Sequence, residues 1–195
     1  MKQFQKQTLI RFALAAVFLP AVALPVCAQQ MVHAVSGTIV SVIPNFKMIE
    51  VSTSDGADSH FQWIRSDKDK IEFDKNVSAD STAVNASAVK GTHIIVYYIG
   101  DGDPRVAVAL RDLGASEVQD VTGTIVKLDR KEHVLVVKNI DGAELTFHLD
   151  AKTVGDTPNG VLENFKFDFN KGTYIRVTYT QVDGVSTAWL IASGL

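Results

Sequence analysis

A histidine and a tryptophan lie close together in the stretch SHFQWIRSD, at His60 and Trp63. Imidazole and thioether groups suit Cu(I), but only Met31 and Met48 remain once the N-terminal leader described below is set aside. No two histidines have the spacing of a zinc site. We therefore favour a polar histidine on an outer face beside a core aromatic.

Motifs that mark catalytic centres are missing from the sequence. It contains no G-x-S-x-G elbow, no H-E-x-x-H pair and no carboxylate pair in a recognisable catalytic frame. The stretch DGDPR at residues 101–105 has two close carboxylates but lacks the further ligands of a Ca²⁺ loop. Because Asp, Gly and Pro favour turns, a hairpin turn explains it. We expect a protein that is not an enzyme and holds no cofactor.

The N-terminus has the order of a secretory signal peptide. Three basic residues precede an uncharged apolar run that starts at Phe12, and VCA at residues 26–28 suits cleavage after Ala28. The apolar run is shorter than the roughly 20 residues of a membrane-spanning helix. We expect residues 1–28 to be removed and the mature chain, without a transmembrane segment, to be periplasmic or secreted. A lipoprotein anchored through Cys27 is less favoured, because bulky Val26 precedes the cysteine.

Removal of this leader makes the chain more acidic. The 195 residues include 19 Lys and Arg and 22 Asp and Glu, a formal charge of −3. The leader holds three of the basic residues and no acidic one, so the remaining chain has a charge of about −6. Affinity for nucleic acid comes mostly from basic groups on phosphates, so we expect no nucleic-acid partner. The only cysteine leaves with the leader, which excludes a disulfide or a thiolate site unless Cys27 is lipidated.

The rest of the chain contains one pattern twice. VSGTIVSV at residues 35–42 matches VTGTIVKL at 121–128 at five of eight positions. KGTHIIVYYI at 90–99 matches KGTYIRVTYT at 171–180 at six of ten positions. An Asp-Gly pair lies between these two matches in each copy. Three landmarks in the same order indicate a duplicated domain.

Each copy is predicted to form five strands, because β-branched and alternating runs are separated by turn residues. Asp-Gly, the strongest short hairpin signal, stands between strands two and three and again between strands four and five. The strands are expected at residues 35–43, 48–52, 60–64, 92–99 and 105–110, and at 121–128, 133–138, 145–149, 173–180 and 185–191.

Three strands, a longer insertion and a final hairpin are the pattern of an OB-type barrel. Gly37 and Gly123 lie inside the first strand of each copy, where a barrel strand must bend. We therefore predict an all-β protein of two tandem five-stranded OB-like small barrels after a signal peptide. The barrels are expected at residues 33–113 and 120–195, with a linker at 114–119.

The pattern V-[ST]-G-T-I-V, an Asp-Gly hairpin and K-G-T before an alternating strand resembles the small secreted bacterial β-barrel domains. Some of those belong to families labelled as domains of unknown function. The chain is also similar to the small periplasmic copper-binding OB barrels. That resemblance implies a metal site of histidine, methionines and tryptophan on strands two and three. His60 and Trp63 match it, but the Met-x-Met pair is absent. The shared motifs are turn and bend residues, so the likeness concerns the fold.

Strand four differs between the copies on one of its faces. Alternate residues of a strand face opposite sides, so the matching sets are predicted to be core: Ile94, Val96 and Tyr98, and Ile175, Val177 and Tyr179. The opposite face carries Ile95, Tyr97 and Ile99 in the first copy, and Arg176, Thr178 and Thr180 in the second. An apolar outer face usually marks a contact surface. We expect it to pack on the other barrel or on a partner, or else beneath the insertion of the first copy.

A phenylalanine stripe occurs only in the second copy, in NFKFDFNKG at residues 164–172. Phe165, Phe167 and Phe169 alternate with polar residues at the period of a strand. We favour an extra edge strand whose phenylalanines close the bottom of the barrel. The alternative is an aromatic platform for a sugar or a peptide.

Together these patterns predict a non-catalytic binding or structural module of the bacterial cell envelope. Its partner would be an envelope protein or a glycan, and a homo-oligomer stays open. The alternative function is a periplasmic copper-binding protein centred on His60 and Trp63. The side chains expected to contact the partner are Ile95, Tyr97, Ile99, Phe165, Phe167 and Phe169.

Overall fold

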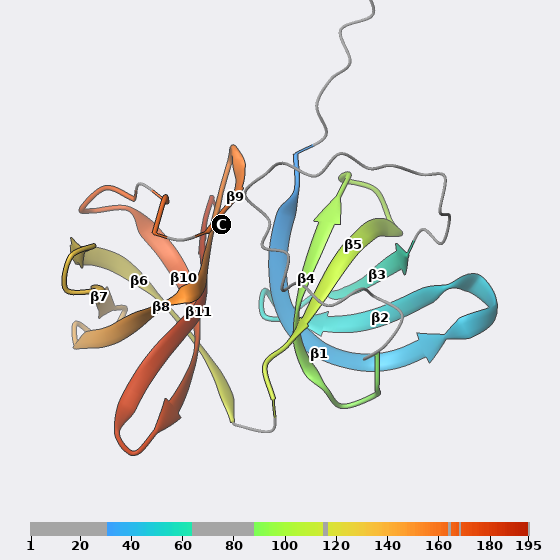
Figure 1. The fold of residues 1–195 in the computed structure, drawn as a ribbon, viewed down its shortest axis with the longest axis horizontal. Coiled ribbons are helices and arrows are strands. Elements are labelled where there is room, and N and C mark those ends of the chain that lie inside the picture. The colour runs from blue at the N-terminus through green and yellow to red at the C-terminus, as the bar shows by residue number, and fades with distance from the viewer. Residues whose placement is uncertain (1–30, 64–87, 115–116, 164, 168, 195) are drawn as a thin grey trace, which may run out of the picture.

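The computed structural model describes residues 31–63, 88–114, 117–163, 165–167 and 169–194. They form two β-barrels that lie side by side (Figure 1). The predicted leader, with Cys27 and the cut after Ala28, lies outside the described residues, as do the first-copy insertion at residues 64–87 and part of the linker. Nothing helical in the described part of the chain is long and apolar enough to span a membrane.

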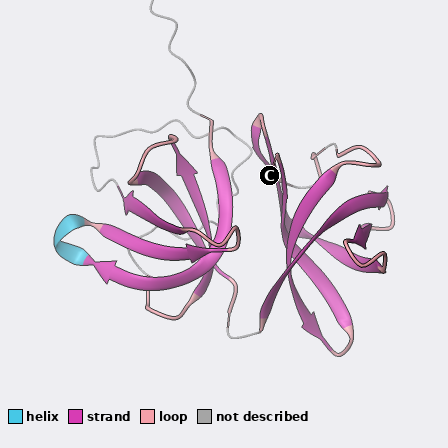
Figure 2. Cartoon of the chain, turned by 180° about the vertical axis from the view of Figure 1, so that it is seen from behind, coloured by secondary structure: helices cyan, strands magenta, loops and turns pink. Residues whose placement is uncertain are grey.

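The first barrel is a closed ring of five strands in the order β1-β2-β3-β5-β4. Strand β4 pairs with β1 to close the ring, and β3 pairs with β5 in parallel. A short 3-10 turn, η1 (Pro44–Phe46), joins the first two strands (Figure 2). The strands are β1 (His33–Ile43), β2 (Met48–Thr53), β3 (Asp58–Trp63), β4 (His93–Ile99) and β5 (Arg105–Asp112).

The second barrel repeats this ring and adds one strand. Its sheet runs β11-β10-β6-β7-β8-β9, and β11 also pairs with β8, which closes five strands in the same order as in the first barrel. The strands are β6 (Val118–Asp129), β7 (Val134–Asn139), β8 (Glu144–Thr157), β9 (Gly160–Leu162), β10 (Tyr174–Val182) and β11 (Val185–Ser193). The prediction of two tandem five-stranded OB-like barrels is confirmed. The long C-terminal half of β8 and the short strand β9 were not predicted.

The two glycines that begin the repeat allow the first strand of each barrel to approach its neighbour closely. A Cβ atom on Gly37 would lie 2.5 Å from a backbone carbonyl oxygen of β2, and one on Gly123 would lie 2.4 Å from a carbonyl oxygen of β7. Three residues later the register shifts, with Val40 and Val126 as the extra residues. The repeated motif therefore specifies the bend of a barrel strand.

Each barrel has its own apolar core, built from the face of strand four that the copies share. Ile94 and Val96 of β4 are 1% and 0% exposed, and Ile175 and Val177 of β10 are fully buried. The prediction of this core face is confirmed. Phe61 fills the first core, and Phe147 and Phe167 fill the second.

A third apolar cluster joins the barrels. Ile95, Tyr97 and Ile99 of β4 are at most 4% exposed and belong to one cluster with Val154 of β8 and Leu190 of β11. This face was expected to pack on the other barrel, on a partner or beneath the insertion, and in the structure it packs on the other barrel. The side chains therefore offer no exposed surface to a separate partner.

The polar face of the second copy is also buried at this junction. Thr178 is 1% exposed and Thr180 is 5% exposed, although both lie on what looked from the sequence like the outer face of an amphipathic strand. Their hydroxyl groups have partners, because Thr178 Oγ1 lies 2.6 Å from Ser36 Oγ of the first barrel and Trp189 Nε1 donates to Thr180 Oγ1. Because these hydroxyl groups are hydrogen-bonded, their burial costs little free energy.

Candidate functional site

A buried ion pair connects the two barrels beside the apolar cluster. Arg111 Nη2 of β5 lies 3.1 Å from Glu163 Oε1, and both side chains are less than a tenth exposed. Arg111 also donates to the carbonyl oxygen of Lys152, and its Cζ lies 5.6 Å from the ring centroid of Tyr97. The Tyr97 hydroxyl donates to Glu163 at 3.4 Å, and burial raises the pKa of that tyrosine. These contacts hold the barrels in one arrangement.

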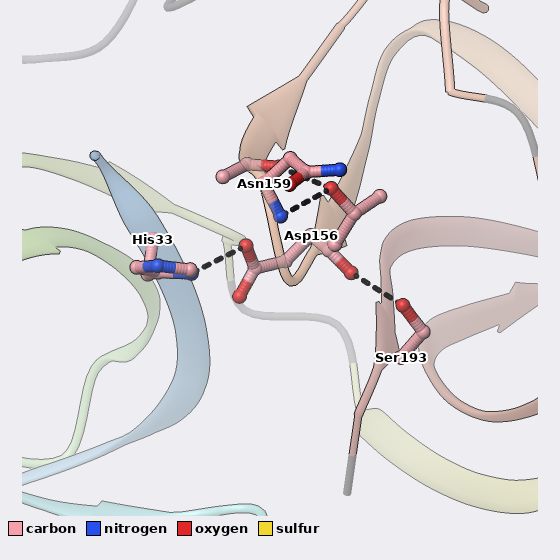
Figure 3. Close-up of polar contacts among 6 residues, drawn as sticks. His33, Asp156, Asn159 and Ser193 are labelled. Carbon is pink, nitrogen blue, oxygen red and sulfur yellow. Dashed lines mark hydrogen bonds and ion pairs between the residues drawn. The ribbon is translucent and has the colours of Figure 1, made fainter.

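Strand β1 and the β8–β9 hairpin form a second polar connection. The Val161 N–H donates to the carbonyl oxygen of Val32 at 2.9 Å, and His33 Nδ1 lies 3.0 Å from Asp156 Oδ1 (Figure 3). Ser193 Oγ donates to the backbone carbonyl of Asp156 at 3.3 Å. Burial raises the pKa of Asp156, and the nearby His33 opposes that rise.

Next to this connection the barrels leave a cleft of about 370 Å³. That volume lies within the range of small-molecule sites, about 300–1,000 Å³. Four charged side chains line it, with Asp55 and Arg105 from the first barrel and Asp156 and Arg176 from the second. Leu190 contributes to the apolar part of the lining. The cleft therefore combines polar groups from two barrels with apolar surface, as binding sites commonly do.

The guanidinium group of Arg105 is held over aromatic rings. Its Cζ lies 4.8 Å from the ring centroid of Tyr98 and 5.9 Å from that of Phe61. The Tyr98 ring is itself packed, with its centroid 5.6 Å from that of Phe61 and 6.0 Å from that of His33. A stacked arginine keeps its N–H groups at the edge of the plane, where they can donate hydrogen bonds.

Donors and acceptors in the cleft are unequally satisfied. Within the described residues, neither Arg105 nor Arg176 has a hydrogen-bond acceptor or an ion-pair partner. The Asp55 carboxylate, in contrast, accepts hydrogen bonds from the Thr53 hydroxyl and the Ala57 N–H. Burial raises the pKa of Asp55. The two hydrogen bonds and the charges of both arginines together lower it by more, so the net shift of the pKa is downward. The polar groups of the cleft that have no described hydrogen-bond partner are therefore the N–H donors of the two arginines.

The predicted phenylalanine platform is mostly core. Phe167 and Phe169 are 0% and 7% exposed and pack inside the second barrel. No strand is formed at residues 165–167 or 169, so the prediction of an edge strand is wrong, while two of the phenylalanines do fill the barrel core. The reason is Gly155 of β8: a Cβ atom there would lie 2.5 Å from Phe167 Cβ, so the phenylalanine lies directly over the backbone. Phe165 is half-buried and stacks on His133, with centroids 4.2 Å apart.

His60 and Trp63 lie on opposite faces of β3. Trp63 packs against the core of the first barrel, whereas His60 Nδ1 lies 3.1 Å from Asp103 Oδ1 on the outside, with 36% of the histidine side chain exposed. Among the described residues, no three His, Cys, Asp or Glu side chains gather as a metal cluster would require. The structure therefore does not bring His60 and Trp63 together.

The charged residues of the cleft were not predicted as a site from the sequence. Arg176 was noted only as a difference between the copies, and Arg105 only as part of a turn. Asp156 lies in the second half of β8, whose turn into β9 is Pro158-Asn159. Pro and Asn are turn residues, and this pair would have predicted a turn here.

Several solved structures match part of the chain. The crystal structure of Ag(I)CusF aligns over 40% of this chain and 99% of its own, with 13% sequence identity and a TM-score of 0.32. No protein-family model matches the chain, and no curated protein is similar to it in sequence.

Proposed function

We propose that the protein is a non-catalytic binding module of the bacterial cell envelope whose ligand site is the cleft between the two barrels. The observation that carries this proposal is a cleft of about 370 Å³ into which both barrels direct charged side chains. The absence of any catalytic motif in the sequence supports binding rather than catalysis.

The contact between the barrels supports a preformed site. The two walls of the cleft belong to different barrels, but the buried apolar cluster and the Arg111–Glu163 pair fix their separation. A site that is already in its binding arrangement loses less free energy to ordering when a ligand arrives. A rigid pair of barrels is therefore suited to hold a small ligand.

The envelope location follows from the N-terminal sequence. Its basic start, apolar run and small residues before position 29 favour export and cleavage after Ala28. The mature protein would then be periplasmic or secreted, and its ligand would be a molecule of that compartment. A glycan fragment or a short peptide segment of an envelope protein fits this expectation.

The test is a variant that fills the cleft. Purified protein is titrated calorimetrically with a panel of monosaccharides, sugar acids, amino acids and short peptides. We expect at least one class to bind, and Ala192→Trp, which puts a large ring in the cleft lining, to abolish binding. Ile140→Trp is the control, since Ile140 is 86% exposed and lies outside the cleft lining. The proposal fails if nothing in the panel binds, or if Ala192→Trp binds like the wild type.

The alternative function, copper binding, has one favourable observation at His60. A carboxylate at one ring nitrogen orients many metal-ligating histidines, and Asp103 lies in that position. Titration with Cu(I) tests it, with His60→Ala as the variant and His148→Ala, an exposed histidine of the second barrel, as the control. We expect no tight stoichiometric site. A tight 1:1 complex that is lost only in His60→Ala would establish the alternative.

A further inference from the structure

We propose that the ligand of the cleft carries a single carboxylate group, and that Arg105 and Arg176, one from each barrel, bind it. This inference rests on the cleft being the ligand site. It goes further by naming the charge and the functional group that the site selects.

In the cleft the acidic side chains have hydrogen-bond partners, whereas the two arginines have none among the described residues. The carboxylates of Asp55 and Asp156 already accept hydrogen bonds from protein donors. The guanidinium groups of Arg105 and Arg176 donate to no described residue. A ligand that completes the site must therefore supply acceptors. Charged acceptors form the stronger hydrogen bonds with arginine.

The geometry of Arg105 suits this role. Its Cζ atom lies over the Tyr98 ring, 4.8 Å from the centroid, so the aromatic contact holds the guanidinium group at the cleft. A guanidinium edge presents two parallel N–H groups that match the two oxygen atoms of a carboxylate. The contact with Tyr98 thus positions the arginine at the cleft before the ligand arrives.

Arg176 lies on the opposite wall of the cleft. It lies on the face of β10 that includes Thr178, at the buried contact between the barrels, and its side chain is half-buried. Arg105 and Arg176 line the same cleft as Asp55, and the charges of both arginines lower the pKa of that aspartate. An anion bound there would interact with both barrels at once.

The acidic side chains of the cleft limit the charge of the ligand. Asp55 and Asp156 also line the cleft, so a doubly charged phosphate would meet two carboxylates as well as two arginines. Like charges within a few ångströms repel, and the repulsion grows with the charge of the ligand. A monocarboxylate is repelled less by the two aspartates and attracted less by the arginines than phosphate is, and its two oxygen atoms match the two parallel N–H groups of one guanidinium edge. Sugar acids and simple hydroxy acids both carry this group.

The experiment compares pairs of probes in which a carboxylate replaces a CH2OH group. Glucuronate is titrated into the protein beside glucose, lactate beside 1,2-propanediol, and inorganic phosphate alone. We expect glucuronate or lactate to bind at least tenfold more tightly than its neutral counterpart and more tightly than phosphate. Equal binding of acid and neutral probe, or tighter binding of phosphate, would overturn the inference without any use of a variant.

Matched variants then assign the group to the arginines. Arg105→Gln and Arg176→Gln keep most of the side-chain length and remove the charge, and each is expected to weaken carboxylate binding at least tenfold. Lys138→Gln, an exposed residue of β7, is the control and should change nothing. If neutral sugars bind, Ala192→Trp blocks them and both glutamine variants bind normally, the carboxylate inference is wrong while the cleft remains the site. If these probes do not bind but a neutral member of the wider panel does, only the carboxylate inference fails; if nothing in either set binds, the proposed function fails with it.

Discussion

The buried pair between the barrels predicts a large and shared loss of stability when it is broken. Arg111→Met removes the guanidinium group 3.1 Å from Glu163 and leaves a carboxylate that is 2% exposed. Removing one partner of a buried pair typically costs about 3–5 kcal/mol. With a urea dependence of about 2 kcal/mol per molar, the unfolding midpoint should fall by about 1.5–2.5 M.

Two tryptophans allow each barrel to be followed separately. The chain has two, Trp63 on β3 of the first barrel and Trp189 on β11 of the second. Urea unfolding is measured by fluorescence in Trp63→Phe and in Trp189→Phe backgrounds, with and without Arg111→Met. Because the barrels share one buried cluster, we expect both probes to report one transition that moves by the same amount.

Two comparisons make this result specific. Replacing Glu163 by Leu together with Arg111→Met removes both charges and should recover most of the loss. Lys127→Met breaks an exposed ion pair with Asp129, in which the lysine side chain is 60% exposed, and should move the unfolding midpoint far less than Arg111→Met does. The reasoning is refuted if Arg111→Met costs no more than Lys127→Met, or if only the probe in one barrel responds.

Two further predictions concern the repeated glycine and the acidic side chains. Gly123→Ala should lower the unfolding free energy by about 1–3 kcal/mol, because the new Cβ would lie 2.4 Å from a carbonyl oxygen, while Gly102→Ala, in open space, should be nearly neutral in the same urea experiment. Asp55 and Asp120 should show opposite pH dependence, since the folded pKa of Asp55 is lowered below 3.8 and burial raises that of Asp120 above it. Wild-type stability from Asp55 is present above pH 3.8 and lost as the pH falls through the lowered pKa, whereas that from Asp120 is present below pH 3.8 and lost as the pH rises through the raised pKa. Melting temperatures at pH 3 and pH 7 should therefore show Asp55→Asn losing most at pH 7 and Asp120→Asn gaining relative to wild type at pH 7; equal shifts at both pH values would contradict this.

Much of the fold could be predicted because strands leave a period-two pattern. The face of β4 with Ile94 and Val96 was identified as core because the second copy repeats it, and Asp-Gly pairs located the hairpins. The second half of β8 was missed because it has no such alternation. Val154 in this half of β8 is buried between the barrels. The pattern of apolar residues there therefore follows the contact with the other barrel and not the core of one barrel.

The site could not be predicted because its residues come from strands far apart in the sequence. Arg105 begins β5, Asp156 lies near the end of β8 and Arg176 lies in β10. None of them belongs to a local motif, and their convergence depends on how two separately folded barrels pack. The phenylalanine stripe shows the reverse error, because a local strand pattern at Phe165 and Phe167 was overridden by the space above Gly155.

The difference between the two copies of strand four decides which side chains line the proposed cleft site. In the first copy, Ile95 and Tyr97 make the outer face of the strand apolar, and the second barrel covers it. In the second copy, the aligned face has Arg176 and Thr178. Thr178 is buried by a hydrogen bond to the first barrel, while Arg176 lines the cleft. An isoleucine at position 176, like Ile95 at the aligned position of the first copy, would extend the apolar contact between the barrels. It would also remove the positive charge from that side of the cleft. The same substitution therefore separates the two roles of this face: Arg176→Ile should keep or raise the unfolding midpoint, because it adds apolar surface beside the junction, and should abolish carboxylate binding.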